Sequence, residues 1–443
     1  MNFNTGHAGK YHLLTYGCQM NVRDSEIIAG ILDGMGYILT PTLKEADLVV
    51  FNTCSVRHSA ENKVYGKLGE VTLLKRDNPD MLIAVGGCMA QLANVRARLK
   101  KQKVDIVFGT NNLHELPHLI NQAKNIPGPV VQVYDREGDI VEHLPSRRDS
   151  NLSAFVNIMY GCNNFCSYCI VPFTRGRERS RMPADIITEI RNLAEQGFKE
   201  VTLLGQNVNS YGRGLQKPAD FADLLNLVNE IEGIERIRFT TSHPRDMTDK
   251  LIDAIAVQPK VCEHIHVAMQ SGSNHILKRM NRGYTREHYL ERTQRIREMI
   301  SGAAITTDII VGFPGESESD FQDTMDMVNK IRFDAAFTFM YSVRTGTTAA
   351  TMDDQVPLDI RRERLISLNK LQYSIAREIN KSLEGTIQEV LVEGLSKTDK
   401  DKLTSRTRTN RIVIFSGPRD LIGRLISVKI TEAKTFSLFG EIM

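Results

Sequence analysis

The sequence has no run of about 20 consecutive apolar residues, the length that a membrane-spanning helix needs. Its first residues, MNFNTGHAGKYH, lack the basic start and the apolar stretch of a secretory signal. Hydrophobic residues make up 41% of the 443 residues and charged residues 25%, which excludes disordered, collagen-like and coiled-coil proteins. We therefore expect a globular protein of about two to four domains in the cytoplasm, with no membrane partner.

An excess of one charge and a disulfide pattern are also missing. The formal net charge is only +3, too small by itself to indicate a nucleic-acid binder. The seven cysteines are an odd number, and a reducing compartment disfavours disulfides. Three cysteines are spread through the first hundred residues, three are clustered and one stands alone: Cys18, Cys54, Cys88, Cys162, Cys166, Cys169 and Cys262.

The first 130 residues predict strands that alternate with helices. Three short, apolar runs end at Cys18, Cys54 and Cys88, and helical patterns follow at 24–35, 60–75 and 92–100. This alternation predicts an open parallel sheet with helices on its faces. The three cysteines then lie just past the carboxyl ends of strands, which is the edge where such sheets bind ligands.

A second α/β block follows a polar, aperiodic stretch at about 135–153, which predicts a linker. Strands are predicted at 155–162, 200–207, 236–243, 263–271, 304–313 and 335–343. Helices are predicted at 184–196, 221–232, 248–257, 286–300, 318–331 and 359–383. Six βα units favour a partial TIM barrel, whose carboxyl edge is where active sites lie.

The last sixty residues predict a small all-β module, because short strands alternate with turn residues. The strands are predicted at 386–392, 411–414, 421–430 and 435–440. From residue 380 onward there are 11 Lys and Arg against 8 Asp and Glu, so this module accounts for the whole net charge.

The sharpest motif is CNNFCSYC, in which Cys162, Cys166 and Cys169 have a CxxxCxxC spacing. One loop brings the three thiolates together, whereas a fully ligated 4Fe-4S cluster usually takes four cysteines. Three ligands would leave one iron open to an outside ligand. Zinc is the alternative, although structural zinc sites favour paired CxxC units with a fourth Cys or His.

This loop, with Tyr168 before its last cysteine, resembles the loop of the radical S-adenosylmethionine (SAM) enzymes. The resemblance implies a 4Fe-4S cluster whose open iron binds SAM, and a 5′-deoxyadenosyl radical that abstracts hydrogen from the substrate. It also implies SAM contacts at later strand ends, where Gly312, Pro314 and Gly315 could instead be turn residues. The implied SAM contacts are Tyr168, Gly205, Gln206, Asn207, Gln270, Ser271, Gly312, Phe313 and Arg344.

The segments TYGCQMN at 15–21, NTC at 52–54 and GGC at 86–88 resemble the N-terminal domain of the methylthiotransferases. The resemblance implies that Cys18, Cys54 and Cys88 hold an auxiliary 4Fe-4S cluster, whose open iron presents the sulfur. The alternative is three unrelated buried thiols. Cys262 lies at the entry to a predicted strand and is expected to be a core thiol.

The C-terminal module resembles a TRAM domain, a small barrel that binds RNA, and its basic stretch is expected to contact phosphates. A solvated surface loop is the alternative. Arg175, Arg177, Arg179 and Arg181 occupy every second position, so in an extended segment they would line one face near the active site, unless they form ordinary salt bridges. The predicted RNA contacts are Arg175, Arg177, Lys397, Lys400, Lys402, Arg406, Arg408 and Arg411.

Taken together, the sequence is identified as a member of the radical SAM methylthiotransferases. With Asp24-Ser25-Glu26 after TYGCQMN, the resemblance implies methylthiolation of carbon 2 of N(6)-dimethylallyladenosine at position 37 of tRNA, with two SAM molecules, one as methyl donor and one as radical source. Ala268 and Val343 depart from the family pattern, which expects proline at both positions. Two relatives' substrates stay open, threonylcarbamoyl-adenosine in tRNA and a ribosomal-protein aspartate, as does a non-enzymatic RNA-binding iron-sulfur protein.

The expected partners are the tRNA anticodon stem-loop and an electron donor such as flavodoxin or ferredoxin, and the chain is expected to be a monomer. The chain has no tryptophan, so Tyr, Phe, His or Arg must stack on the target base. We expect a methylthiotransferase domain at 10–130, a linker at 131–152, a radical SAM core at 153–383 and a TRAM domain at 384–443.

Overall fold

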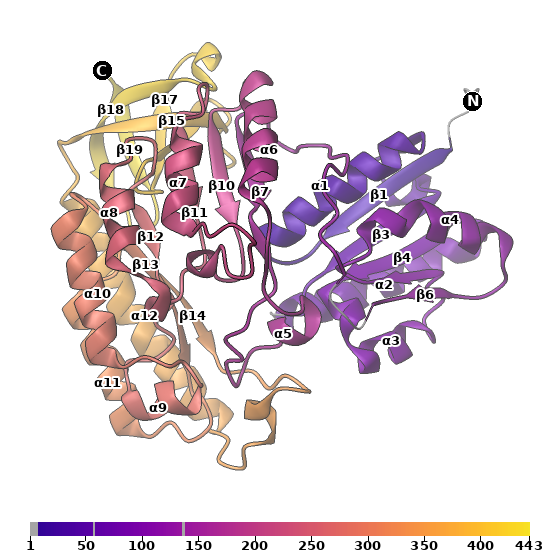
Figure 1. Cartoon of the computed structure of the whole chain (residues 1–443), viewed down its shortest axis with the longest axis horizontal. Coiled ribbons are helices and arrows are strands. Elements are labelled where there is room, and N and C mark those ends of the chain that lie inside the picture. Colours follow the sequence, from indigo (N-terminus) through magenta and orange to yellow (C-terminus); the bar gives the residue numbers. More distant parts are fainter. Residues whose placement is uncertain (1–7, 56–57, 135–137) are drawn as a thin grey trace.

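The computed structural model, which describes residues 8–55, 58–134 and 138–443, begins with a parallel sheet in the order β2-β1-β3-β4-β5-β6 (Figure 1). Its strands are β1 (Gly9–Thr15), β2 (Tyr37–Leu39), β3 (Leu48–Thr53), β4 (Leu82–Gly87), β5 (Ile106–Phe108) and β6 (Val130–Gln132). Its helices are α1 (Gln19–Gly34), α2 (His58–Asp77), α3 (Ala93–Leu99) and α4 (Leu116–Asn125).

The alternating side chains of β3 explain why this sheet has helices on both faces. Leu48 and Val50 pack with α1 and α4, whereas Val49 and Phe51 pack with α2 and α3. A central strand buried on both faces must be apolar throughout, as LVVF is. The chain leaves β1 toward β2 and returns to β3 on the other side, so the carboxyl ends of β1 and β3 form a topological switch point, a usual ligand site.

The central domain is an open barrel of parallel strands. Two sheets, β7-β10-β11 and β12-β13-β14, are joined by bridges from Ile237 to Val261 and from Ser242 to Val267. Its strands are β7 (Ser153–Asn157), β10 (Glu200–Leu204), β11 (Arg236–Phe239), β12 (His264–His266), β13 (Ala304–Val311) and β14 (Ala335–Met340). Among the described residues β14 and β7 form no pairing with each other, so the predicted partial barrel is confirmed.

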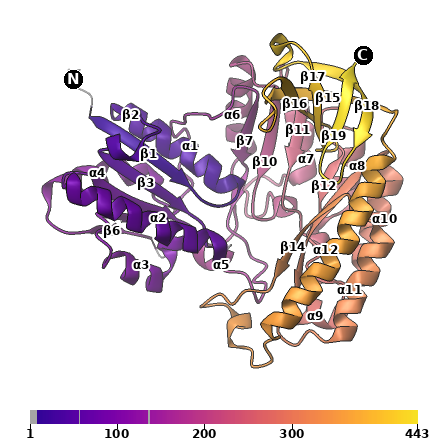
Figure 2. The ribbon, with the colours of Figure 1, turned by 180° about the vertical axis from the view of Figure 1, so that it is seen from behind.

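Helices cover the outside of this barrel (Figure 2). They are α6 (Pro183–Glu195), α7 (Phe221–Asn229), α8 (Asp249–Val257), α10 (Arg286–Met299), α11 (Glu318–Ile331) and α12 (Leu358–Lys381), with the short α5 (Val171–Thr174) and α9 (Asn274–Arg279). Side-chain caps fix several starts: Thr248, Thr285 and Ser317 each accept a backbone N–H in the first turn.

The C-terminal module is a closed barrel in the order β15-β16-β17-β19-β18. Its strands are β15 (Ile387–Leu395), β16 (Lys402–Thr407), β17 (Ile412–Ser416), β18 (Leu425–Ala433) and β19 (Leu438–Ile442). It docks on the amino ends of the central strands, where the buried guanidinium of Arg236 donates to the Arg406 carbonyl (2.7 Å) and to Glu389 Oε1 (2.9 Å). The barrel therefore lies opposite the carboxyl edge, where the active site is expected.

Three local predictions were wrong. The basic stretch read as a possible loop contains β16, whose inward Leu403, Ser405 and Thr407 alternate with outward polar residues. The predicted strand at 155–162 is two strands, β7 and β8 (Met159–Tyr160), and β8 pairs antiparallel with β9 (Arg179–Ser180). The predicted strand at 263–271 ends as β12 at His266, and Gln270 beyond it has a positive φ of 67°, which regular strands do not adopt.

Short elements of the first domain gave too little signal to predict. The structure adds β2, β5 and β6, each of three residues, and the helix α4. In the described part of the chain, every helix is too short or too polar to cross a bilayer.

Candidate metal centres

The CxxxCxxC loop follows β8 and leads into α5. Gly161 opens it with a φ of 76°, and a Cβ there would lie 2.0 Å from the carbonyl oxygen of Arg177, so only glycine fits. The Cys162 N–H donates to the Gly176 carbonyl (3.1 Å) and the Cys169 N–H to the Cys166 carbonyl (2.9 Å). These bonds fold the loop into one turn that carries all three thiols.

A buried arginine that the sequence did not single out contacts this loop. Arg282 donates from Nη1 to Cys166 Sγ (3.3 Å) and from Nη2 to the Ala268 carbonyl (2.9 Å). Burial raises the pKa of Cys162 and raises the pKa of Cys169 to about 12, so these thiols hold their protons unless a metal replaces them. No spacing pattern marks Arg282, because a loop after α9 brings it to the cysteines.

The second set of cysteines is assembled by the sheet. Cys18 follows β1, Cys54 follows β3 and Cys88 follows β4, and the strands pair with Thr15 opposite Asn52 and Thr53 opposite Gly87. A Cβ on Gly17, where φ is 139°, would lie 2.8 Å from Cys54 Cβ. The prediction that the fold gathers these three thiols at one sheet edge agrees with this geometry.

Buried amides support this second set. Cys18 Sγ donates to Asn21 Oδ1 (3.4 Å), and Asn21 Nδ2 donates to Asn52 Oδ1 and to the Thr53 carbonyl (both 3.2 Å). Asn52 Nδ2 in turn donates to Ser25 Oγ (2.9 Å). Both asparagines belong to the motifs TYGCQMN and NTC, so the motifs marked them, although their structural role needs the fold.

Arg175 corrects a prediction, because it is not placed to contact RNA. It is only 4% exposed, donates from Nη2 to Asp24 Oδ2 (2.6 Å) and from Nε to Cys88 Sγ (3.4 Å). Burial raises the pKa of the Cys88 thiol, and the Arg175 guanidinium opposes that rise. Arg175 ends α5, six residues after Cys169, so it connects the two cysteine sets across the domain seam.

The neighbouring arginines also fail to form an exposed basic strip. Arg181 is buried and pairs with Glu142 (2.6 Å) and Glu189 (2.7 Å). The Arg179 guanidinium donates to Asn111 Oδ1 (3.2 Å), and the Arg177 guanidinium stacks 4.3 Å from the Phe165 ring centroid. The alternative of ordinary salt bridges therefore holds for Arg181, whereas Arg177 is exposed and its RNA contact stays a prediction.

The donor geometry bears on which metal group would fit. Among the described residues, no three Cys, His, Asp or Glu side chains converge closely enough to ligate a single ion, as zinc requires. An iron-sulfur cluster takes one thiolate per iron, so its ligands stand farther apart. Each set supplies three cysteines, of which Cys54 and Cys88 in one and Cys162 and Cys166 in the other are buried, and one sulfur in each contacts a guanidinium, which fits a cluster at each centre.

Polar atoms without partners gather at the carboxyl edge of the central barrel. Five buried side-chain atoms from successive strand ends have no hydrogen-bond partner: Asn157 Oδ1, Gln206 Oε1, Ser242 Oγ, His243 Nε2 and Tyr341 Oη. Burying such atoms unpaired is costly, so they suit a polar ligand at this edge. Burial lowers the pKa of His243 to about 2, so this imidazole is neutral, and because its Nδ1 accepts from the Arg245 N–H (3.3 Å), its Nε2 carries the proton and can donate.

The residues predicted to contact SAM have different environments in the structure. Tyr168 and Tyr341 pack edge-on against the buried Phe313, with ring centroids 6.4 and 5.4 Å apart. Gly312 has a φ of 68° and donates its N–H to Glu316 Oε1 (2.8 Å). Gly205 packs against Met159 and Val208, close enough that a Cβ would meet the Met159 side chain at 2.5 Å.

Other predicted SAM contacts are engaged with the protein. Asn207 donates to Asp246 Oδ2 (2.6 Å) and accepts from the His243 N–H (3.1 Å), so both ends of its amide are used. The Ser271 hydroxyl accepts from the Ser273 N–H (3.2 Å), and the Gln270 backbone pairs with β13. Gln206 donates to Met20 Sδ of the first domain, beside Cys18.

Arg344 lies toward the first domain. Burial lowers the pKa of its guanidinium, and the charges of Glu61 and Cys54 oppose that effect. It therefore faces the auxiliary cysteines as well as the barrel edge. The isolated Cys262 is 1% exposed, as expected for a core thiol.

The TRAM arginines form ion pairs. Arg408 pairs with Glu263 (2.7 Å) and Arg411 with Asp334, both in the central domain, whereas Arg406 pairs with Glu393 of β15 within the module (2.6 Å). The remaining predicted contacts, Lys397, Lys400 and Lys402, lie at the turn between β15 and β16, and the first and second are exposed.

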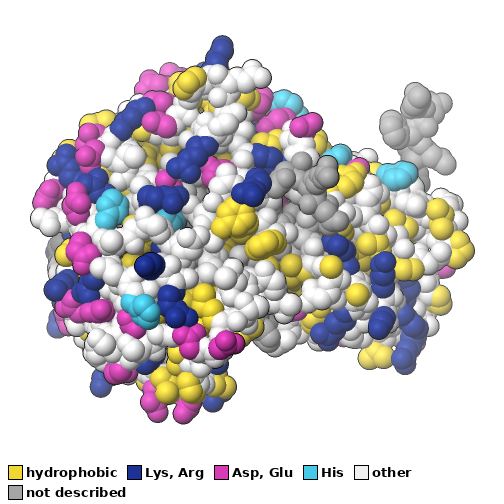
Figure 3. All heavy atoms as spheres, turned by 60° about the horizontal axis from the view of Figure 1, so that its bottom comes forward, with side chains coloured by type: hydrophobic (Ala, Val, Ile, Leu, Met, Phe, Trp, Pro, Cys, Tyr) yellow, Lys and Arg dark blue, Asp and Glu magenta, His cyan; other side chains and the backbone are white. Residues whose placement is uncertain are grey.

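The chain outside the TRAM module has no net charge, but one region of it is basic. Between residues 58 and 103, nine Lys and Arg stand against four Asp and Glu. Figure 3 shows Lys and Arg gathered on the visible face of the first domain, whereas basic and acidic side chains intermix over the barrel. The guanidinium of Arg98 on α3 stacks 3.6 Å from the Tyr65 ring centroid on α2, which joins the two helices of this region.

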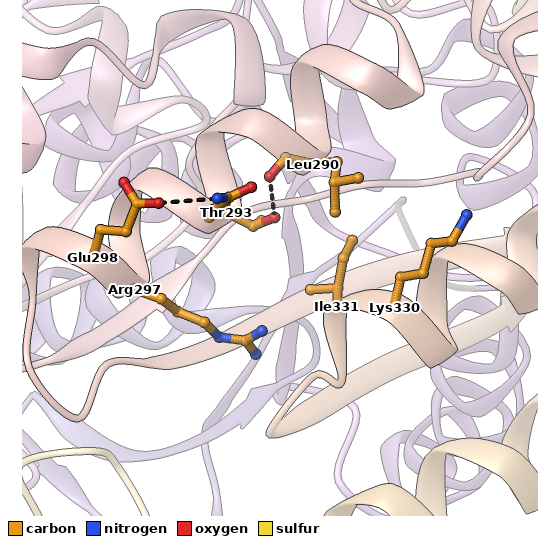
Figure 4. A pocket seen from close by; sticks show the side chains of 7 residues that line it. Leu290, Thr293, Arg297, Glu298, Lys330 and Ile331 are labelled. Carbon is orange, nitrogen blue, oxygen red and sulfur yellow. Dashed lines mark hydrogen bonds between the residues drawn. The ribbon is translucent and has the colours of Figure 1, made fainter.

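A hollow on the outer helices is separate from these centres (Figure 4). It lies between α10 and α11, with Leu290 and Ile331 as its apolar part and Arg297, Glu298 and Lys330 around them. It belongs to the outside of the barrel and contains no residue of either cysteine set.

The fold and the cysteine loop define a radical SAM enzyme with an added thiol-bearing domain and a TRAM barrel. The family model "Radical SAM superfamily" matches residues 156–328, "Uncharacterized protein family UPF0004" residues 10–109 and "TRAM domain" residues 381–443. Similar solved structures are the methyltransferase TsrM from Kitasatospora setae (15% identity, TM-score 0.57, covering 86% of this chain and 78% of that one) and the radical enzyme OxsB (11%, 0.51, 83% and 57%). At these identities the likeness concerns the fold alone.

Curated relatives narrow the class. The tRNA-2-methylthio-N(6)-dimethylallyladenosine synthase of Syntrophomonas wolfei is 67% identical over 433 residues, covering 98% of this chain and 97% of that one. The protein of the same name from Carboxydothermus hydrogenoformans is 54% identical over 435 residues, covering 98% and 99%. This chain belongs to the family of tRNA-2-methylthio-N(6)-dimethylallyladenosine synthases, which confirms the predicted enzyme class, with SAM and a 4Fe-4S cluster as cofactors and tRNA as substrate.

Proposed function

We propose that this protein methylthiolates carbon 2 of N(6)-dimethylallyladenosine at position 37 of tRNA, using two SAM molecules and two 4Fe-4S clusters. Cys162, Cys166 and Cys169 hold one cluster. Cys18, Cys54 and Cys88 hold the other. The observation that carries the proposal is the contact of Arg175, at the end of the helix that follows the first set, with Cys88 of the second (3.4 Å). Two thiol sets at one seam suit a reaction in which sulfur and a carbon-centred reaction partner must meet.

A 4Fe-4S cluster with an iron open to SAM supplies, when bound, the electron that cleaves SAM and starts hydrogen abstraction. The chain's own residues position and shield that chemistry. Arg282 donates to Cys166 Sγ and Arg175 to Cys88 Sγ, which favours the thiolate form at each centre. The edge-packed rings of Tyr168, Phe313 and Tyr341 form an apolar wall that excludes water.

The tRNA contact is proposed at two places. Lys397, Lys400 and Lys402 of the TRAM turn and the basic region of α2 and α3 are placed to contact phosphates. A base in an anticodon loop is already largely unpaired, so extruding it costs little. We further propose that the chain works as a monomer in the cytoplasm and receives electrons from a flavodoxin or ferredoxin. We also propose that it divides at 10–130, 131–152, 153–383 and 384–443; the first two family matches fall within these divisions, and the TRAM match begins three residues earlier, at 381.

Mass spectrometry of tRNA nucleosides tests this function. A strain without this protein is expected to lose 2-methylthio-N(6)-dimethylallyladenosine and accumulate N(6)-dimethylallyladenosine, and expression of the wild-type chain should reverse both. Unchanged tRNA nucleosides would contradict the substrate. Loss of a methylthio group from threonylcarbamoyl-adenosine or from a ribosomal-protein aspartate would instead reassign the activity.

A further inference from the structure

The edge strand β14 turns two phenylalanines toward the inside of the open barrel. Thr338 Oγ1 donates to Asn369 Oδ1 of α12 (2.6 Å), so the even-numbered residues of β14 face the covering helix. The odd-numbered residues therefore face the opposite, inner side. Phe337 and Phe339 are among them, and they remain 56% and 37% exposed. Figure 2 shows β14 at the margin of the barrel, beside α12.

A polar pair lies beside these rings on the same inner face. Strand pairing sets Asp308 opposite Phe337 and Ile310 opposite Phe339. His266 of β12 lies with its ring centroid 6.1 Å from that of Phe337, and its Nε2 is 3.4 Å from Asp308 Oδ2. The neighbouring Ile265, Ile305 and Ile309 point the other way, into the core under the helices. We call Phe337, Phe339, His266, Asp308 and Ile310 the inner patch.

The position of the inner patch along the barrel fits a substrate site. On β13 the inward residues run from Thr306 through Asp308 and Ile310 to Gly312, and Gly312 is at the predicted SAM edge. The TRAM barrel closes the opposite end, where Arg411 pairs with Asp334 just before β14. The inner patch thus lies between the SAM edge and the RNA-binding module, next to the unpaired side of β14 in the described chain.

The inner patch combines aromatic rings with a polar pair, and the modified base of the substrate has groups that match both. Aromatic rings exposed together on a surface often mark a binding site. N(6)-dimethylallyladenine offers a flat ring for stacking, a branched apolar group, and an N–H with ring nitrogens for hydrogen bonding. An unmodified base would offer the rings no branched partner.

We propose that the inner patch binds the N(6)-dimethylallyladenine base, with Phe337 and Phe339 against the ring and the dimethylallyl group, and Asp308 and His266 at its polar edge. This proposal rests on the proposed function and deepens it, because it names the residues that select tRNA already carrying the dimethylallyl group. The aromatic residues supply the stacking that a chain without tryptophan must find elsewhere.

Two synthetic anticodon stem-loop RNAs, identical except for adenosine or N(6)-dimethylallyladenosine at position 37, test the inner patch. The reconstituted holoenzyme is titrated with each, and the ratio of the two dissociation constants is the readout. Wild type is expected to prefer the modified RNA. Phe337→Ala is expected to lower that preference by about tenfold, the scale of about two buried methylene groups of the dimethylallyl contact, and Asp308→Ala by less.

Matched variants separate recognition from folding. Thr338→Ala alters the other face of the same strand, and Phe436→Ala removes an exposed ring (70%) of the TRAM module, so both should keep the wild-type ratio. A folding defect would weaken both RNAs equally and leave the ratio unchanged. Phe337→Ala and Asp308→Ala variants that bind the unmodified RNA as tightly as wild type and keep the wild-type ratio would overturn the inner patch. Wild type that binds the two RNAs equally would also overturn the patch, whereas the nucleoside analysis tests the substrate separately.

Discussion

The two cysteine sets reach similar arrangements by opposite routes. Cys162, Cys166 and Cys169 come from one turn of eight residues, so a short segment brings them together, and the Ser167 N–H ties it to the Met280 carbonyl (3.0 Å). Cys18, Cys54 and Cys88 come from three strand ends, so only the paired sheet assembles them. We call the first three cysteines the loop set, because one loop carries them. We call the second three the sheet set, because only the folded sheet brings them together. The second should therefore depend more strongly on distant packing.

The two sets nevertheless share two devices. A glycine with positive φ precedes Cys18, Cys88 and Cys162, at 139°, 90° and 76°. One buried guanidinium contacts a sulfur in each set, Arg175 at Cys88 and Arg282 at Cys166. Their charge balance differs: Arg175 is neutralised by Asp24, whereas Arg282 donates to a tyrosine, a carbonyl and a sulfur.

Removing one thiol from each set should give the largest effect and show whether the sets are independent. Cys166→Ala is expected to abolish SAM cleavage, whereas Cys54→Ala should keep SAM cleavage and lose methylthiolation. Each variant should hold about four iron atoms per chain rather than about eight. Iron analysis and assays for 5′-deoxyadenosine and modified tRNA measure this. Cys262→Ala is the control that should keep both clusters, and a Cys54→Ala protein with the full iron content would refute the auxiliary assignment.

The pair between Arg175 and Asp24 should have the next largest effect. Arg175→Met leaves the Asp24 carboxylate buried and unpaired, which should lower the free energy of unfolding by about 3–5 kcal/mol. The double variant with Asp24→Asn should recover a large part of that loss, because it removes the orphaned charge. Denaturant unfolding measures both proteins. Equal free energies of unfolding for the single and double variants would show that the Arg175–Asp24 pair does not stabilise the contact between the two domains.

The sequence predicted the loop set from spacing and the sheet set from strand periodicity, because three apolar runs each end at a cysteine one βα unit apart. It could not predict Arg282, since a long-range approach after α9 brings this residue to Cys166. Alternation marked Arg175 for RNA, but the structure buries it, because local spacing carries no information about which domain packs against it.

The same limit explains the TRAM module. A basic composition indicated RNA contact along the whole stretch, yet Arg406 pairs with Glu393 within the module, and Arg408 and Arg411 pair with Glu263 and Asp334 of the central domain. Charge counts report a net value and not the partners of each charge. The three-residue strands β2, β5 and β6 were missed because so short a run carries no period.

The guanidinium of Arg282, which contacts the loop set, should raise the reduction potential of the cluster held there. Arg282→Met removes a positive charge and an N–H donor from Cys166 Sγ, so the reduced, more negative cluster should become harder to form. The reduction potential should fall by on the order of 60–100 mV, the equivalent of one charged hydrogen bond. Redox titration followed by electron paramagnetic resonance measures it. Arg282→Lys keeps the charge and should shift the potential less, and an unchanged potential in Arg282→Met would rule out this role.

The smallest expected effect tests directly whether the sheet set depends more on packing than the loop set. Asn21→Ala removes the acceptor of Cys18 Sγ and the amide that donates to Asn52 Oδ1, which should cost about 1–3 kcal/mol of unfolding free energy and lower the occupancy of the auxiliary cluster. Ser167→Ala is the matched change beside Cys166, where the lost bond from Ser167 Oγ to the Arg279 carbonyl (2.8 Å) should cost about 1 kcal/mol and leave the loop cluster filled. Unfolding curves and iron content decide between them. If Ser167→Ala empties the loop cluster while Asn21→Ala leaves the auxiliary cluster intact, the loop set would be the one that depends on its surroundings, because its turn would then be held from outside by α9.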